Sequence, residues 1–176
     1  MFRQFEPVGS TAEVDFVTLK DVMATSAERC HLNFVTLDGS GGNAWKRAVA
    51  SALDSALPGV AAYVKNDHLG FGIPYVHQGI SRLYLPDFLV RLADAGDGVV
   101  RTLIVEVSGG RKSPGPTAEK AATARESWVP AVNSHGGYGL WGYCEIGRVS
   151  EITKAKQVLT EAMDALTVLS APCRAA

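Results

Sequence analysis

The chain has 176 residues, of which 47% are hydrophobic and 20% are charged, and its formal net charge is -1 at pH 7. This length suits one domain with a full core and is short for two. The composition excludes a disordered or fibrous chain and is typical of a globular α/β or α+β protein. A net charge near zero gives no sign of a polyanion partner, but it does not exclude one, because basic residues can gather on one face.

The cysteines and the apolar runs indicate the compartment. Cys30, Cys144 and Cys173 are far apart and have no C-x-x-C spacing, so the sequence predicts neither a disulfide framework nor a zinc site. No apolar run approaches the roughly 20 residues that a membrane helix needs, and "MFRQFEPVGS" lacks the apolar segment of a secretory signal. We therefore expect a soluble, cytoplasmic protein with no membrane partner.

The first half of the chain divides at about residue 42. Residues 1–42 read as an N-terminal extension with short strands, because "CHLNFVTLD" alternates apolar and polar positions before "GSGG" interrupts it. Residues 43–176 form the main domain. Its first helix starts at Asn43, a favourable N-cap residue, and ends at Pro58-Gly59. The apolar stripe of this helix consists of Trp45, Val49, Ala52, Leu53 and Ala56.

Strands follow in the middle of the chain. Apolar segments at 60–64, 69–77 and 81–92 predict strands, with "QG" at 78–79 as a hairpin turn between the second and the third. The segment "VVRTLIVEVSGG", residues 99–110, has almost no polar face, which places it near the centre of an antiparallel or mixed sheet.

The last third of the chain reads as helix, strand and helix. Residues 117–137 predict a helix that ends at a glycine pair and that Pro130 kinks or shortens. Residues 138–147 predict a strand, and 151–169 a closing amphipathic helix. The inward positions of that closing helix are Val158, Leu159, Ala162, Leu166 and Leu169.

Two acidic residues interrupt apolar strands and suggest chemistry. Glu106 shares one strand face with Ile104 and Ser108, because side chains two residues apart point the same way. A carboxylate in such a strand is costly unless it is paired. Asp87, after Pro86, interrupts the preceding apolar run. Two acids on adjacent strands would make an oxygen-rich site for a hard cation such as Mg²⁺, which can polarise a phosphodiester and activate a water.

The pattern "PD" at 86–87 followed by "EVS" at 106–108 resembles the PD-(D/E)xK nuclease signature with its lysine replaced by Ser108. The surrounding segments "AAYVKNDHLGFGIPYVHQGISRLYLPDFLVRL" and "KAATARESWVPAVNSHGGYGLWGYCEI" resemble the C-terminal endonuclease domain of type III-like restriction enzymes, whose large subunits join a helicase to a nuclease. The resemblance covers most of residues 31–150.

This resemblance implies a restriction-endonuclease-like fold, a central mixed β-sheet flanked by helices, and hydrolysis of double-stranded DNA in defence. Asp87 and Glu106 would be the ligands of Mg²⁺ or Mn²⁺, and Ser108 would hold the position of the catalytic lysine without its charge. Lys46 follows Trp45 where the family tends to place an acid. The chain has no nucleotide-binding loop, so a helicase (ATPase) or methyltransferase partner would be a separate chain.

Two lysines are candidates to replace the missing cation. Lys112 lies beyond the glycine pair, and Lys120 lies on the next helix, a relocation known in the superfamily; we favour Lys120 slightly, although an exposed helix lysine paired with Glu119 or Glu126 is an equal alternative. Two functions stay open: a magnesium-dependent endonuclease with Asp87, Glu106, Ser108 and Lys120 at its site, and a degenerate nuclease fold that binds DNA or a restriction-complex partner without cleaving.

Overall fold

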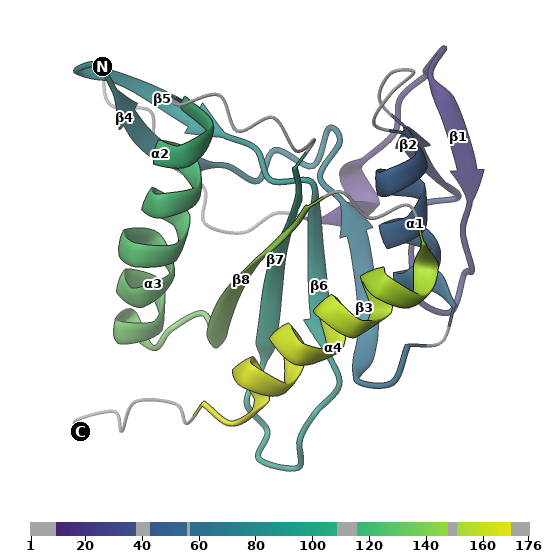
Figure 1. Cartoon of the computed structure of the whole chain (residues 1–176). Helices are drawn as coiled ribbons and strands as arrows, with labels where there is room; N and C mark the ends of the chain where they lie inside the picture. The colour runs from purple at the N-terminus through teal and green to yellow at the C-terminus, as the bar shows by residue number, and fades with distance from the viewer. Residues whose placement is uncertain (1–9, 38–42, 56, 109–115, 148–150, 170–176) are drawn as a thin grey trace.

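The computed structural model describes residues 10–37, 43–55, 57–108, 116–147 and 151–169. Its centre is a four-stranded mixed sheet (Figure 1) with the strand order β3-β6-β7-β8. β7 is antiparallel to β6 and parallel to β8, so the prediction of a central mixed sheet is confirmed, and β7, which lies within the predicted strand segment, is one of its inner strands. These strands are β3 (Val60–Lys65), β6 (Phe88–Leu92), β7 (Arg101–Val107) and β8 (Leu140–Ile146).

Two antiparallel strand pairs flank the central sheet. β1 (Asp21–Ala24) pairs with β2 (Phe34–Leu37), and β4 (Ile73–His77) pairs with β5 (Ile80–Tyr84). The predicted hairpin turn between β4 and β5 is confirmed. Gln78 and Gly79 both have positive φ angles, 51° and 75°, as a two-residue turn between twisted strands requires.

The segment 81–92, predicted as one strand, is divided in the structure. β5 ends at Tyr84 and belongs to the hairpin, whereas β6 starts at Phe88 and belongs to the central sheet. Pro86 has no N–H for a strand ladder, which explains why pairing stops in between. Asp87 is therefore the residue at which the chain enters the central sheet.

Helices cover both faces of this sheet (Figure 1). α1 and α4 pack on one face; the other is covered by one continuous helical segment that comprises α2, a π-helical turn and α3. The bounds are α1 (Asn43–Asp54), α2 (Pro116–Ala122), the π-helical turn (Thr123–Trp128), α3 (Val129–His135) and α4 (Ile152–Thr167), and a short 3-10 helix, η1, spans Thr11–Glu13. Among the described residues, no helix has the length and apolar character needed to cross a bilayer.

Three details of the helices differ from the sequence prediction. α1 ends at Asp54, four residues before Pro58. Pro130 does not shorten its helix, which continues to His135 and ends, as predicted, at the glycine pair, with Gly136 in the left-handed conformation. Pro130 lies at the start of α3, just after the π-helical turn. In α4, Leu169 is 45% exposed and lies beyond the helix end, while Ala155 and Met163 complete the buried stripe.

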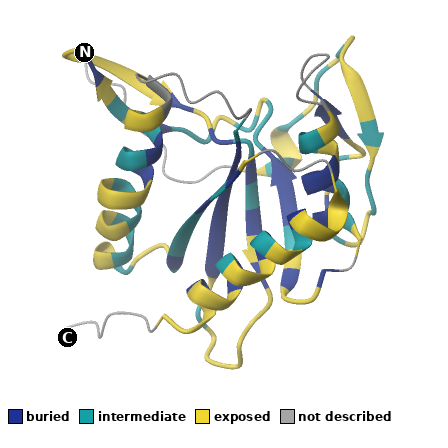
Figure 2. Cartoon of the chain, in the orientation of Figure 1, coloured by how far each residue is buried: buried dark blue, intermediate teal, exposed yellow. Residues whose placement is uncertain are grey.

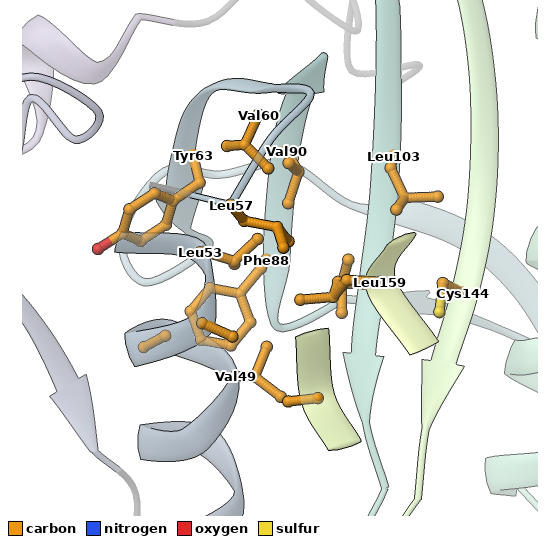
Figure 3. Close-up of a cluster of buried hydrophobic side chains, with 14 of the residues drawn as sticks. Val49, Leu53, Leu57, Val60, Tyr63, Phe88, Val90, Leu103, Cys144 and Leu159 are labelled. Carbon is orange, nitrogen blue, oxygen red and sulfur yellow. The ribbon is translucent and has the colours of Figure 1, made fainter. Parts of the chain in front are cut away.

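The two sheet faces carry different cores. The face under α1 and α4 holds a large, mainly aliphatic cluster that includes Val49, Phe88, Leu103 and Leu159 (Figure 3). The opposite face holds a smaller, aromatic-rich cluster around Ile104. Cys30, Val35 and Leu37, from the predicted N-terminal extension, belong to the large cluster, so β2 and Cys30 are packed into the domain core. Figure 2 shows the central strands as the most buried part of the fold.

Candidate active site

Asp87 and Glu106 lie opposite each other at the end of the sheet where β6 begins and β7 ends. Phe88 pairs with Val105 in the antiparallel register, so one further step along both chains brings Asp87 beside Glu106. Directly opposed residues on antiparallel strands point to the same face. The backbone amide of Val107 donates a hydrogen bond to Asp87 Oδ2 at 2.9 Å, which fixes this arrangement.

Glu106 is almost fully buried and is bound by two partners. The hydroxyl of Tyr84 donates to Glu106 Oε2 at 2.8 Å, and the ammonium of Lys120 contacts Oε1 at 3.0 Å. The same ammonium lies 4.9 Å from the centre of the Tyr84 ring. Burial raises the pKa of Glu106, and the negative charge of Asp87 raises it further, while Lys120 and Tyr84 act in the opposite direction.

Asp87 also pairs with a lysine, which comes from a different helix. Lys46, in the first turn of α1, places its Nζ 2.7 Å from Asp87 Oδ1, and both side chains are more than four-fifths buried. The residue that replaces the expected acid after Trp45 is thus in direct contact with the carboxylate pair, the name we give to Asp87 and Glu106. Each carboxylate of the pair has its own ammonium partner.

The carboxylate pair lines a polar cavity of about 350 Å³. Four lysines and three acidic side chains face this cavity, which is the charge pattern of a site for an anion, or for an anion together with a cation. The lining residues are Lys20, Lys46, Lys65, Asn66, Asp67, Leu85, Pro86, Asp87, Glu106, Val107 and Lys120.

The structure brings together three of the four predicted site residues. Asp87, Glu106 and Lys120 line the cavity. Ser108 lies just beyond β7, where its backbone amide donates to the carbonyl of Ile146 at 2.9 Å, and it is not one of the lining residues. Lys112, the alternative cation, lies outside the described residues, as does the glycine pair before it.

Sequence reasoning missed part of the site. Tyr84 lies in an apolar run of the sequence. The role of its hydroxyl becomes visible only in the structure, where it donates a hydrogen bond to Glu106. Lys20 and Asp67 lie in irregular segments, and no motif marks them. Lys65, one of several basic residues that the sequence offers for a phosphate-facing surface, directly follows the predicted strand 60–64, where a lysine is normally solvent-exposed. Lys65 is only 5% exposed, so its burial could not be read from the pattern.

The donor set of the carboxylate pair is compatible with a magnesium ion. Two carboxylates are the hard oxygen ligands that Mg²⁺ uses together with waters and substrate phosphates. In the part of the chain that the structure describes, no three His, Cys, Asp or Glu side chains gather into a closed metal cage. Asp87 and Glu106 are the residues that would hold the ion, and substrate or water would complete its coordination.

Comparisons with known proteins add no family assignment, because no family model, no curated protein and no solved structure matches the chain.

Proposed function

We propose that this protein is a magnesium-dependent endonuclease that hydrolyses phosphodiester bonds in double-stranded DNA, as part of a restriction-type defence system. The observation that carries the proposal is the meeting of Asp87, Glu106 and Lys120 in one polar cavity, with the Lys120 ammonium 3.0 Å from Glu106. The sequence resemblance to type III-like restriction enzymes points to DNA as the substrate.

Each residue has a defined task in this proposal. Asp87 and Glu106 bind Mg²⁺ or Mn²⁺, which when bound polarises the scissile phosphate and lowers the pKa of a water. Lys120 supplies the positive charge that the Ser108 position lacks, and stabilises negative charge on the phosphoryl oxygens. Tyr84 holds the Glu106 carboxylate in place through its hydroxyl. The Val107 amide does the same for Asp87.

A second function, DNA or partner binding without cleavage, is favoured by a different observation. Lys46 contacts Asp87 at 2.7 Å, so a cation occupies a place where the resemblance expects a further acid. An ammonium group beside one ligand repels a divalent ion and lowers the affinity of the site for it. A nuclease fold that had lost activity would retain this pair as an internal salt bridge.

Plasmid cleavage separates the two functions. The purified chain is incubated with supercoiled plasmid and Mg²⁺ or Mn²⁺, beside Asp87→Asn, Glu106→Gln, Lys120→Ala and Ser108→Lys variants. An endonuclease nicks the plasmid, and each acid variant loses about 100-fold or more of the rate, because one of the two carboxylate ligands of the metal ion is missing. Lys120→Ala should also lose about 100-fold, since the charge it supplies acts in the transition state.

The main control removes the same charge as Lys120→Ala, but outside the cavity. Lys154→Ala removes a lysine whose side chain is 65% exposed and pairs with Glu151, away from the cavity, and it should cleave like the parent. An inert parent whose activity appears only in Ser108→Lys would establish the second function. Isothermal titration with Mn²⁺ measures metal binding and shows whether the acid variants no longer bind the ion or bind it without cleaving DNA.

A further inference from the structure

A second charged group lies beside the carboxylate pair, in the same cavity. Lys20, Lys65 and Asp67 line that cavity, and together with Thr36, which contacts Lys65 and Asp67, they form what we call the lysine–aspartate cluster. Lys65 Nζ lies 3.2 Å from Thr36 Oγ1 and 3.7 Å from Asp67 Oδ2. Lys20 Nζ lies 3.4 Å from the same Asp67 oxygen. Two ammonium groups therefore converge on one carboxylate.

The cluster is rigidly connected to the proposed catalytic residues. Lys65 pairs with Phe88 in the sheet register, one position from Asp87. The backbone amide of Asn66 donates to the carbonyl of Asp87 at 2.9 Å, and the Asn66 side chain donates to the carbonyl of Pro86 at 3.0 Å. The strand end that carries Lys65 and the corner that carries Asp87 are thus held together by hydrogen bonds.

Burial makes this cluster unusual for a simple surface ion pair. The Lys65 side chain is 6% exposed and Thr36 is 3% exposed. An ammonium group loses its hydration there, so it needs hydrogen-bonded and charged partners that offset this cost. Burial raises the pKa of Asp67, but the Thr36 hydrogen bond and the two lysines outweigh that effect and lower it, so Asp67 stays ionised between the two ammonium groups.

We propose that Lys20 and Lys65 form a second phosphate subsite, which binds the backbone phosphate next to the one held at the carboxylate pair. The proposal rests on the proposed function, because it takes the bound nucleic acid as its ligand. Lysine binds phosphate as a point charge, without the fixed geometry of arginine, which suits a subsite that any backbone phosphate can occupy. Lys20 precedes β1 and Thr36 lies in β2, so the N-terminal segment completes this subsite.

The experiment measures binding rather than cleavage. A fluorescent 12-base-pair duplex is titrated with the full chain in EDTA, by anisotropy, at several salt concentrations. Lys20→Ala is the main variant, because its side chain is 46% exposed and its loss leaves the core intact. We expect it to weaken binding by about three- to tenfold at low salt and to reduce the slope of log affinity against log salt by about one, the effect of one lost phosphate contact.

Three comparisons make this result specific. Lys20→Arg keeps the charge and should bind like the parent, and Lys154→Ala, which removes an equally charged residue outside the cavity, should change neither affinity nor slope. Lys65→Met tests the buried member, with its melting temperature measured alongside. If Lys65→Met does not fold, the Lys20 variants still decide the question.

The outcomes distinguish the subsite from the proposed function. If the parent binds the duplex and Lys20→Ala binds it with the same affinity and the same slope, the subsite is overturned, whether or not the parent cleaves plasmid. The subsite is also overturned if the parent does not bind the duplex. If Lys20→Ala reduces the slope of log affinity against log salt but the parent does not cleave plasmid, the result supports the subsite and counts against the nuclease. Titration with inorganic phosphate is the last arm: a Lys20-dependent phosphate site without a change in duplex binding would mean a small-anion site and would also overturn the proposal.

Discussion

The two faces of the central sheet are built from the same strands but differ in what β7 buries from Leu103 to Val107: one face buries only apolar side chains of this segment, and the other also buries a charged one. Under α1 and α4, β7 contributes Leu103, Val105 and Val107 to an aliphatic core. On the other face, the alternate residues of the same strand are Ile104 and Glu106. One face therefore gains its stability from close packing, and the other gives up part of that packing to hold a charge.

The second face is divided along its length. At one end, the rings of Phe71, Trp128 and Trp141 pack with centroid separations of 5.2–5.6 Å. At the other end, Tyr84 ends the aromatic cluster and donates its hydroxyl to Glu106. Tyr84 thus connects the aromatic-rich cluster to the buried carboxylate, and the polar site lies at one end of a sheet whose buried residues are mostly apolar.

The largest effect should come from the aliphatic face. Phe88 has no exposed surface, and Phe88→Ala leaves a cavity between β6 and the helices. We expect the free energy of unfolding to fall by about 3–5 kcal/mol, the usual cost of a buried Phe→Ala change. Urea denaturation followed by circular dichroism measures the loss. A loss below about 1 kcal/mol would contradict the assignment of this face as the main source of stability.

A smaller effect should come from the site face. Tyr84→Phe removes only the hydroxyl that contacts Glu106, and the ring keeps its place in the aromatic cluster. We expect a loss of about 1.5–3 kcal/mol, because a hydrogen bond to a charged group disappears and the buried carboxylate loses a donor. Tyr138→Phe, at a residue 44% exposed, is the matched control and should be neutral. Equal stability of the two variants would show that the Tyr84 hydroxyl does not support the site.

The sequence predicted the order of the elements because hydrophobic periodicity and turn residues are local. The helices, the Gln78-Gly79 hairpin turn and the interior position of β7 follow from such patterns. The meeting of Asp87 and Glu106 could also be anticipated, since two acids in neighbouring apolar strands had one common explanation. Strand register was needed to place them directly opposite each other.

What the sequence could not predict depends on long-range contacts. Lys20 and Asp67 are 47 positions apart, and nothing in either segment indicates that they meet. The same holds for Lys46 and Asp87, which come from α1 and from the start of β6 and meet only in the folded chain. The break between β5 and β6 was marked by Pro86, but an apolar run on both sides of the proline concealed it.

The smallest effect in this comparison is a change of pH dependence. The pKa of Glu106 is raised by burial and by Asp87, so its carboxyl holds a proton more tightly in the folded than in the unfolded chain. As the pH rises above the ordinary glutamate range, the unfolded state releases this proton first, and the folded state loses stability relative to it until the folded-state pKa is passed. Glu106→Gln has no such proton, so its stability relative to the parent should increase as the pH rises above about 4, the ordinary range of a glutamate carboxyl.

Melting temperatures of the parent and of Glu106→Gln, measured from about pH 4 upward without divalent metal, test the sign. Glu151→Gln, at a side chain 63% exposed, is the control for the loss of one surface carboxylate. Lys120 and Tyr84 partly offset the cost of burying the charge, which is why we expect a smaller change than for Phe88→Ala or Tyr84→Phe. A stability difference that stays constant or falls with pH would mean that the ion pair with Lys120 outweighs burial, and that the site face, like the aliphatic face, is built for stability.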